Sequence, residues 1–433
     1  MGHEVTLACL DYPHLGPQVA APGVRVVSVR GNIFAVRGRG WCPEFRRVLR
    51  EEAAKADVVH NHGLWMWPNA YAREAAVGAG KPLIISPRGM LEAWSLGRSK
   101  LRKAVAWRLF ERKNLQAAVM FHATAESERE SIRDATKRLK DQETKRPRWE
   151  GGKVEKCEGE TRIIVAPNGV DLPDLGRRPA RQVLEGKFPE LRDRRSVVFM
   201  SRLHPKKGIY VLLRAWRKQQ NVEQGAWGME QGAGGMGKHT AYGLRHAEKK
   251  ESLGLLVSSS VGRGGDLSPV SGLRPSNSGC PVLVLAGSDL IGYRKDIERM
   301  IKELGLEDSV VITGEVAGEM KDCLLANADV CVLPSYSENF GIVVAEAMAW
   351  GRPVIASTGT PWQEVADVGA GWWVKPEEGA IAQALHEALG KGREELDVMG
   401  AKGRALVSER YTWAAPAAKL LGAYEELLAK GNF

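Results

Sequence analysis

"SENFGIVVAEAMAWGRPVIAS", residues 337–357, carries two glutamates, Glu338 and Glu346, separated by an almost wholly apolar run. The preceding "ADVCVLPS" is short, apolar and β-branched, which is typical of a buried parallel strand that ends at Pro334. "GIVVAEAMAWG" then predicts a buried helix that ends at Gly351. The stretch therefore predicts strand, loop and helix, with Glu338 in the loop and Glu346 in the helix.

Both acids would then lie where an open α/β sheet binds its ligands, outside the carboxyl ends of the strands. The amides of Asn339, Phe340 and Gly341 stand between them, and a helix N-terminus favours an anion such as a diphosphate. On this stretch alone an alternative stays open, in which Glu338 caps the helix and Glu346 makes a surface ion pair.

Strand-like and helical patterns alternate along the whole chain, which predicts an α/β fold with parallel sheets. Six strand-like runs precede the turn-rich "NGVDLPDLG" (168–176) and five follow it, and each set is sufficient for one Rossmann-like sheet. We therefore predict two Rossmann-like domains that face each other across a cleft, at residues 1–172 and 173–411, and a C-terminal helix at 412–433.

Two segments interrupt this alternation. Residues 135–160 are highly charged, and residues 218–280 contain Gly clusters and a Ser run. Structureless connections of that length are uncommon in compact domains, so we interpret both as disordered or weakly ordered insertions. Non-native sequence, such as unspliced or misassembled coding sequence, is the alternative.

Composition excludes several classes of protein. The 433 residues are 44% hydrophobic and 26% charged, which is globular, and no apolar run approaches the ~20 residues of a membrane span. The six cysteines form no CxxC or Cys/His cluster, so we predict no metal site and a reducing compartment. "MGHEVTLACLD" lacks the pattern of a secretory signal, and we expect a cytoplasmic location.

The net charge of +10 suits an anionic ligand or an anionic membrane surface, and we expect no nucleic-acid partner. "RSKLRKAVAWRLFERK" (98–113) predicts a basic amphipathic helix, with Leu101, Val105, Leu109 and Phe110 available for one face. A surface helix with a solvated basic side is favoured, and peripheral contact with a membrane or docking of the acceptor is the alternative.

A second strand–turn–helix unit, "VVFMSRLHPKKGIYVLLRAW" (197–216), places Arg202 and Lys207 in its turn. Arginine holds two phosphate oxygens with its planar fork, and lysine supplies a point charge. At the carboxyl edge of the second sheet these cations would face the same space as Glu338 and Glu346. A pair of solvated loop cations is the alternative.

Here a resemblance becomes specific. "SRLHPKKG", "VLAGSD", "LPSYSENFGIVVAEAMAWGRPVIAS" and "GTPWQEV" resemble the donor-binding half of the family 4 glycosyltransferases of the GT-B fold, and the two glutamates match that family's E-x7-E motif. "VVHNHGLW", "SPRGML", "HATAESERESIR" and "VAPNGVDL" are similar to its acceptor half. The resemblance covers nearly everything except the two insertions.

The resemblance implies transfer of a sugar from a nucleotide-sugar donor to a saccharide or lipid-linked acceptor, with retained anomeric configuration and without metal ion or cofactor. Exopolysaccharide, lipopolysaccharide or glycolipid synthesis is the expected setting. It also implies that "YTWAAPAAKLLGAYEELLAK" forms a C-terminal helix that crosses back onto the first domain.

The same resemblance assigns roles on the donor side. Arg202 and Lys207 resemble the cations that stabilise the departing diphosphate. Glu346 resembles the acid that accepts hydrogen bonds from the ribose hydroxyls. Glu338, with the amides of Asn339–Gly341, would bind hydroxyls of the donor sugar.

On the acceptor side, His62 ends the strand-like "DVVHNH" and resembles the family's cleft-facing histidine beside the donor sugar. His60 is the alternative, since residues two apart on a strand share a face. Arg88 and Gly89 follow the strand-like "PLIIS", where an acceptor could reach. Asn168, in "PNGVD", is interpreted as a turn or hinge residue rather than a ligand.

One departure affects both fold and activity. The resemblance implies a strand, a glycine-rich loop and a helix before a "GHEV"-like turn, yet Met1 here directly precedes "GHEV". In the strand order 3-2-1-4-5-6 that absent strand would be central, and its absence would leave unpaired strand edges. We therefore expect a truncated first domain. Two other functions remain alternatives: a non-hydrolysing sugar-nucleotide epimerase of the same fold, and an inactive nucleotide-binding remnant.

Overall fold

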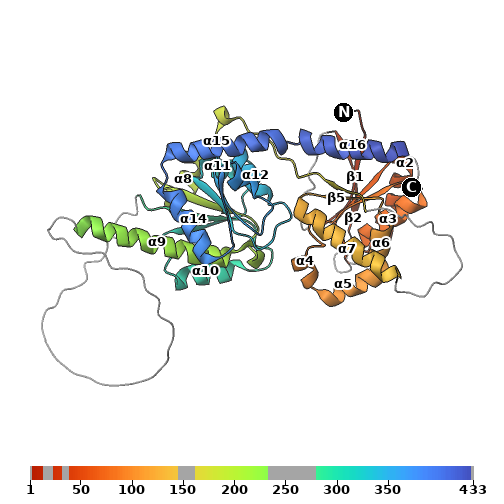
Figure 1. The fold of residues 1–433 in the computed structure, drawn as a ribbon, viewed down its shortest axis with the longest axis horizontal. Coiled ribbons are helices and arrows are strands. Elements are labelled where there is room, and N and C mark those ends of the chain that lie inside the picture. The colour runs from red at the N-terminus through yellow and green to blue at the C-terminus, as the bar shows by residue number, and fades with distance from the viewer. Residues whose placement is uncertain (1, 13–22, 32–38, 145–160, 233–278, 431–433) are drawn as a thin grey trace, which may run out of the picture.

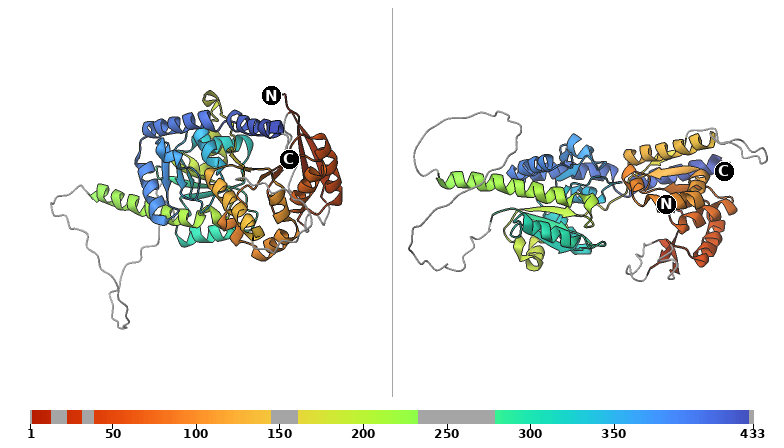
Figure 2. Two further views of the ribbon diagram at one scale, coloured as in Figure 1. Left: turned by 45° about the vertical axis from the view of Figure 1, so that its right-hand side comes forward. Right: turned by 90° about the horizontal axis from the view of Figure 1, so that it is seen from below.

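The computed structural model describes residues 2–12, 23–31, 39–144, 161–232 and 279–430, which form two lobes side by side (Figure 1). Each lobe is built on parallel strands covered by helices, as two further views also show (Figure 2). The predicted α/β fold with parallel sheets is confirmed. Among the described residues, no helix combines the length and the apolar composition needed to cross a lipid bilayer.

The second lobe holds a six-stranded parallel sheet with the order β9-β8-β7-β10-β11-β12. Its strands are β7 Ser196–Met200, β8 Val282–Ala286, β9 Val310–Gly314, β10 Val330–Leu333, β11 Val354–Ser357 and β12 Gly371–Val374. The central strands are continuous apolar runs because helices cover both of their faces. Strand order reverses between β7 and β10, which is where a doubly wound sheet opens a ligand crevice.

Helices connect these strands. They are α8 Arg181–Lys187, α9 Ile209–Gly232, α10 Arg294–Glu303, α11 Gly318–Asn327, α12 Ile342–Ala349, α13 Glu364–Asp367, α14 Glu378–Gly390 and α15 Arg393–Arg410. Three short 3-10 turns accompany them: η3 Leu175–Arg177, η4 Pro189–Leu191 and η5 Pro205–Lys207. Strand β12, "GWWV", was not predicted from the sequence.

The first lobe contains two separate parallel sheets. The larger has the order β3-β4-β5-β6, and the smaller pairs β1 with β2. Their strands are β1 Val5–Asp11, β2 Val24–Arg30, β3 Val59–His62, β4 Leu83–Ser86, β5 Met120–Ala123 and β6 Ile163–Val165. The helices are α2 Pro43–Lys55, α3 Trp67–Gly78, α4 Ala93–Gly97, α5 Lys100–Ala106, the π-helix η2 Trp107–Glu111, α6 Arg112–Ala117 and α7 Glu126–Thr144.

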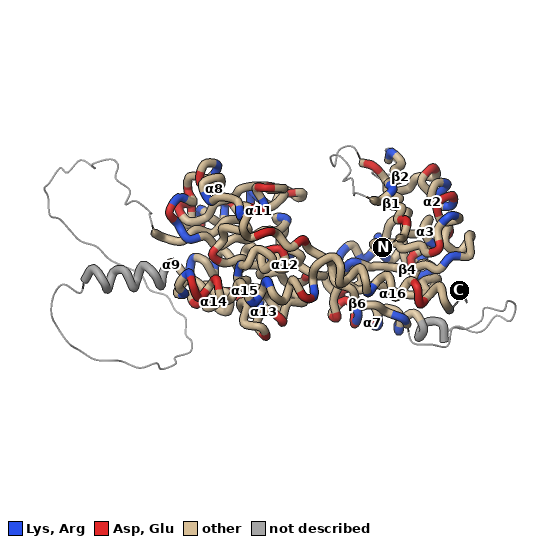
Figure 3. The backbone as a smooth tube through the Cα atoms, turned by 90° about the horizontal axis from the view of Figure 1, so that it is seen from above, with Lys and Arg blue, Asp and Glu red and all other residues tan. Residues whose placement is uncertain are grey.

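The prediction of a single sheet in the first half was therefore wrong. Within the described residues no strand pairs with both β1 and β3, so β1 and β2 lie apart from β4 and β6, beside α2 and α3 (Figure 3). The separation leaves Val5 and Leu7 of β1 53% and 47% exposed. In the order 3-2-1-4-5-6 a further strand would lie between β1 and β3, and none of the described residues occupies that position.

The predicted insertions begin too early in both cases. Helix α7 continues to Thr144, with Thr136 and Leu139 buried, and helix α9 continues to Gly232. Each helix extends beyond its apolar pattern because polar residues continue it at little cost. The rest of the two predicted insertions, 145–160 and 233–278, lies outside the described residues.

The C-terminal helix α16 Ala414–Lys430 packs against the first lobe. Ala423 and Leu427 contact Ile84 and Met120 from the larger sheet. Figure 1 shows α15 and α16 in line along one side of the two lobes. The chain thus leaves the first lobe after β6 and returns to it at its end.

A buried acid lies beneath the helical stretch of the first lobe. Glu111 is fully buried, where it accepts a hydrogen bond of 2.6 Å from the Trp65 amide and one of 3.4 Å from the Asn114 side chain. Burial is the largest effect on this carboxyl and raises its pKa to about 7, against the two hydrogen bonds. Above a pH of about 7, folding must therefore bury the ionised carboxylate of Glu111.

We expect Glu111→Gln to be increasingly stabilising, relative to wild type, as the pH rises. The folded pKa of Glu111 exceeds the unfolded one, so wild-type stability is lost between the unfolded value and about 7, while glutamine does not titrate. The difference in unfolding free energy should grow by about 2 kcal/mol from pH 5 to pH 8. Urea unfolding of both proteins measures it, and a difference independent of pH would contradict the raised pKa of Glu111 in the folded protein.

Candidate functional site

A cavity of about 470 Å³ opens at the carboxyl ends of β7 and β10, at the reversal of strand order. It contains every residue that the sequence placed on the donor side. They are Arg202, Lys207, Glu338, Asn339, Phe340, Gly341 and Glu346. Asn168, from the segment that joins the lobes, also lines it, so the sequence interpretation of this residue as a turn alone was incomplete.

The turn after β7 brings Lys207 close to the end of β10. Gly208 has a φ of +71°, and a Cβ built there would lie 2.1 Å from the Pro334 carbonyl oxygen. Only glycine fits such an approach without displacing the backbone. The short turn η5 ends at Lys207, so its ammonium reaches across the reversal of strand order toward the loop after β10.

Lys207 and Glu338 form a close ion pair, with both side chains 11% exposed. The lysine ammonium donates to Glu338 Oε1, which also accepts a hydrogen bond of 2.7 Å from the Ser335 hydroxyl. No described residue bonds the second carboxylate oxygen of Glu338. The sequence had assigned these residues to diphosphate and sugar separately, and the structure shows that they also hold each other.

Glu346 lies on α12 and accepts a hydrogen bond of 3.0 Å from Lys321 of α11. Both side chains are partly exposed at the cavity, and both line it. Sequence reasoning missed Lys321. Its signal was weak, since a single lysine in a helix more than 20 residues upstream of Glu346 is ordinarily a surface charge.

Three groups at the cavity have unused hydrogen-bonding capacity. Arg202 is exposed and has no hydrogen bond or ion pair to the described residues. The side-chain oxygen of Asn339 is buried without a partner in the described chain. Gly341 precedes α12, so the unpaired amides at the start of that helix face the cavity lining at Ile342 and Val343. Together they provide donors, an acceptor and a positive helix end.

The backbone between the two glutamates is held from behind. The Trp362 indole donates to the Phe340 carbonyl oxygen, and the two rings lie 5.0 Å apart between centroids. The Glu338 amide donates to the Gly359 carbonyl oxygen at 2.7 Å. The loop after β10 is therefore fixed at both ends before any ligand binds, which reduces the entropy lost on binding.

His62 ends β3 and reaches the cleft, with its ring stacked on His60 at 4.3 Å. Its Nδ1 accepts hydrogen bonds from Arg88 at 3.1 and 3.3 Å, so the proton of the neutral ring is on Nε2. Burial, and then the charges of Arg88 and His122, lower the pKa of His62 to about 4. His62 is therefore a neutral donor at pH 7.

His60, the sequence alternative, lies on the same face of β3 but is hydrogen-bonded into the protein interior. Its Nδ1 bonds the Tyr424 hydroxyl of α16 at 2.5 Å, and its Nε2 bonds the Ser86 hydroxyl at 2.6 Å. Ser86 continues to His122, whose Nε2 donates to the Ala166 carbonyl oxygen at 2.8 Å. Burial is the main reason that the pKa of His60 falls well below its ordinary value. His60 is thus part of a buried network, and His62 is the cleft residue.

Arg88, which is hydrogen-bonded to His62, and the next residue, Gly89, do not line the cavity. Arg88 adopts a φ of +55°, which non-glycine residues rarely do, and donates to Asn168 Oδ1 at 2.7 Å. The buried Glu128 carboxylate accepts the Gly89 amide at 2.6 Å and thereby fixes the loop. Since Asn168 lines the cavity, Arg88 connects His62 to the donor side. No carboxylate of the described residues forms a salt bridge with Arg88.

The two lobes touch across the cleft, and all but Asn339 of the groups involved were missed by sequence reasoning. Glu92 accepts a hydrogen bond of 2.6 Å from Ser337 and lies 3.8 Å from the Lys206 ammonium. The side-chain amide of Asn339 donates to the Thr124 hydroxyl at 2.7 Å. These contacts join the loop after β4 and the end of β5 to both walls of the cavity. Such pairings are not visible in sequence because they involve ordinary polar residues far apart in the chain.

No cluster of three or more His, Cys, Asp or Glu side chains that could hold a metal ion occurs within the described residues. The positive groups at the cavity are instead side chains and helix amides. Arg202 and Lys207 come from the turn after β7, and the amides come from α12. Cations and helix amides of this kind can stabilise a diphosphate.

Comparison with known proteins agrees with this geometry. A model of the glycosyl transferases group 1 family matches residues 278–406, and a model of the glycosyl transferase 4-like domain matches residues 1–139. Together they match more than half of the chain. The first of these matches includes Glu338 and Glu346, and the second includes His62 and Arg88.

Individual relatives match shorter parts. The MMP alpha-(1->4)-mannosyltransferase of Mycolicibacterium hassiacum is 33% identical over 135 residues, which are 31% of this chain and 33% of that protein. The D-inositol 3-phosphate glycosyltransferase of Mycolicibacterium smegmatis is 31% identical over 156 residues, or 35% of each protein. The chain thus matches about a third of the length of these curated relatives.

Solved structures match nearly the whole chain. Anabaena HepE in complex with UDP and glucose superposes with a TM-score of 0.58 at 18% identity, over 94% of this chain and 86% of that one. Sucrose-phosphate synthase from Thermosynechococcus elongatus gives a TM-score of 0.62 at 20% identity, over 96% and 86%. At these identities the likeness concerns the fold. With both family models, it shows that the chain belongs to the family 4 glycosyltransferases of the GT-B fold.

Proposed function

We propose that the chain transfers a sugar from a nucleoside-diphosphate donor to a hydroxyl acceptor with retention of anomeric configuration and without a metal ion. The observation that carries the proposal is the cavity at the reversal of strand order. There Arg202, Lys207 and the start of α12 face the same volume as Glu338 and Glu346. Cations and helix amides suit a diphosphate, and carboxylates suit hydroxyls.

In this proposal the donor lies along the cavity with its diphosphate beside Arg202 and Lys207. As the bond between the anomeric carbon and the diphosphate oxygen breaks, negative charge grows on the leaving group, and the two cations stabilise it. Glu346 binds the ribose hydroxyls. Glu338 and the amides of Asn339–Gly341 bind the donor sugar through the carboxylate oxygen that Lys207 leaves unbonded. The acceptor oxygen bonds the anomeric carbon on the face that the diphosphate leaves, and the proton of the acceptor hydroxyl passes to the departing diphosphate oxygen.

The acceptor side comprises His62, Arg88 and Gly89. His62 carries its proton on Nε2 and can donate it in a hydrogen bond to a donor-sugar hydroxyl near the reacting carbon. Within the described parts of the chain, the hydrogen-bond partners of the Arg88 side chain are both neutral, His62 and Asn168, so its charge remains available to an acceptor. A saccharide or lipid-linked acceptor fits this side.

For the donor, we propose a class of sugar on the basis of the similar proteins. The HepE structure holds UDP and glucose, and the two curated relatives are a mannosyltransferase and an inositol-phosphate glycosyltransferase. A hexose linked to a nucleoside diphosphate is therefore the first donor to test. Synthesis of an exopolysaccharide, lipopolysaccharide or glycolipid, at the cytoplasmic side of a membrane, is the setting we propose.

The test is incubation of the chain with a panel of nucleotide hexoses, with detection of free nucleoside diphosphate and of the glycosylated acceptor. We expect one donor to be hydrolysed or transferred at a rate unchanged by a chelator, with a product of the donor's anomeric configuration by NMR. An epimerised nucleotide sugar as the product would contradict transfer. Binding of nucleoside diphosphate without turnover of any donor would favour the inactive nucleotide-binding chain.

A further inference from the structure

The helical stretch α5–η2 presents an apolar face to solvent. Leu101, Val105 and Leu109 are 80%, 51% and 57% exposed, and their spacing of four residues places them on one side of the stretch. Phe110 and Ala106 of the same stretch are buried in the first lobe. The apolar face anticipated from sequence is thus divided: Phe110 packs inward, and the three others point outward.

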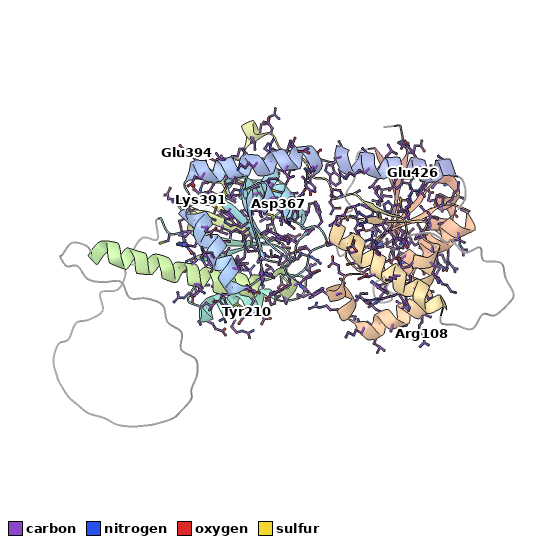
Figure 4. All side chains as sticks on the ribbon, in the orientation of Figure 1. Arg108, Tyr210, Asp367, Lys391, Glu394 and Glu426 are labelled. Carbon is purple, nitrogen blue, oxygen red and sulfur yellow. The ribbon has the colours of Figure 1, made fainter. Side chains whose placement is uncertain are left out.

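The charges around this face are of one sign. In residues 98–113 the exposed ionisable side chains are all basic, and the single acid, Glu111, is buried. The exposed ones are Arg98, Lys100, Arg102, Arg108 and Lys113. Figure 4 shows Arg108 extending from the edge of the first lobe, on the side opposite α16. No acidic side chain of this segment offsets them in solution.

A groove lies between this stretch and the start of α3. It has a volume of about 320 Å³ and an apolar lining of tryptophan, leucine, valine, alanine and phenylalanine side chains, with two arginines, Arg39 and Arg102. Trp65 belongs to its wall, and the Lys103 ammonium lies 5.5 Å from the Trp65 ring. Its apolar lining suits a hydrocarbon chain, and the cations that border it suit a phosphate.

We propose that the surface formed by Leu101, Val105, Leu109 and the surrounding cations, here named the basic apolar face, binds the headgroup region of an anionic lipid bilayer. The three apolar side chains would insert below the headgroups, and the cations would contact lipid phosphates. The groove would receive one lipid chain. A protein partner would have to supply several carboxylates around an apolar centre, whereas an anionic bilayer supplies both features at once.

The proposal does not depend on the transferase reaction, because the basic apolar face lies outside the donor cavity. It does bear on the acceptor. Trp65 of the groove follows His62 by three residues, so a lipid in the groove would be near the acceptor side. The hydrocarbon chain of a lipid-linked acceptor would then lie in the groove, and its headgroup would lie at the acceptor side.

Co-sedimentation of the full chain with vesicles tests the proposal. We expect binding to vesicles in which about a third of the phosphatidylcholine is replaced by phosphatidylglycerol, little binding to phosphatidylcholine alone, and release as salt shortens the Debye length. Lys100→Gln and Arg108→Gln should each lower the partition coefficient about fivefold, which corresponds to ~1 kcal/mol for each cation. Absence of wild-type binding to both kinds of vesicle would overturn the proposal.

A matched pair of variants separates insertion from nonspecific charge. Leu101→Glu with Leu109→Glu should lower partition to anionic vesicles by at least about tenfold, since two apolar side chains are lost and two acids gained. Val183→Glu with Val398→Glu, at exposed positions on α8 and α15 of the second lobe, adds the same two charges and should change partition by the overall charge alone. All these positions are exposed, so melting temperatures should stay near wild type. Equal partition of the leucine and valine variants would contradict insertion of this face.

Discussion

Lys207→Ala is expected to lower turnover by about 10²–10³, the usual loss for one preorganised group that stabilises transition-state charge, or ~2.7–4 kcal/mol. Lys207 is suited to this role because its ammonium is largely buried at the cavity and fixed by Glu338. Little reorganisation is then needed as the diphosphate leaves. Arg202→Ala should cause a loss of similar order, with less effect on stability, because Arg202 is exposed and bonded to no described residue.

Two controls keep the Lys207 result interpretable. Removal of Lys207 leaves Glu338 buried beside Ser335 alone, which costs stability, so the melting temperature must be measured beside turnover. Lys207→Arg keeps the charge and should recover part of the activity. Lys391→Ala, at a surface ion pair on the far side of the second lobe, should leave turnover unchanged (Figure 4). Near-normal turnover in both Lys207→Ala and Arg202→Ala would place these cations outside the site.

The strands were predictable because local patterns determine them. "SVVFM" and "PVLVL" are continuous β-branched runs, and both form fully parallel central strands. The continuation of α7 to Thr144 and of α9 to Gly232, where the described residues stop, was not predictable, because no apolar stripe marks it in the sequence. The separation of β1 from β3 depends on which strands pair, and those strands are far apart in the chain. Only the resemblance pointed toward it, by implying unpaired strand edges in the first domain.

The site was predictable where a residue stands at the end of a strand. Arg202 and Glu338 follow β7 and β10, and the topology of a doubly wound sheet brings those ends together. Partner choice was not predictable. Lys207 pairs with Glu338, and Lys321 pairs with Glu346, through contacts that depend on side-chain placement in three dimensions. The same holds for Glu92, which looks like an ordinary surface acid in sequence yet joins the lobes at the cleft.

The contacts of Glu92 have a consequence for the donor-free state. Its carboxylate lies 3.8 Å from Lys206, beside the turn that carries Lys207, and it accepts from Ser337, beside Glu338. One acid of the first lobe thus contacts both walls of the donor cavity in the second. The walls are therefore aligned with the acceptor side before a donor arrives, so the lobes bring less disorder to be lost on binding.

The two glutamates of the opening stretch should differ sharply in their effects. If Glu346 binds ribose, its contacts are alike in the ground and transition states, so Glu346→Gln should weaken nucleoside-diphosphate binding and raise KM. A hydrogen bond to a charged group contributes about 1.5–3 kcal/mol, so the affinity loss should be about tenfold or more. Its surface pair with Lys321 adds little to stability, and the variant should fold normally.

Glu338→Gln should act on turnover instead. Its carboxylate lies against Lys207, so neutralising it removes repulsion toward a diphosphate and leaves Lys207 with less competition. Nucleoside-diphosphate affinity should therefore stay equal or increase, while turnover falls and discrimination among donor sugars weakens. Calorimetric titration of nucleoside diphosphate and donor kinetics measure both effects, with Glu394→Gln on exposed α15 as the control. Equal loss of nucleotide affinity in both variants would refute separate roles, and no loss of affinity or turnover in either would make Glu338 and Glu346 structural acids.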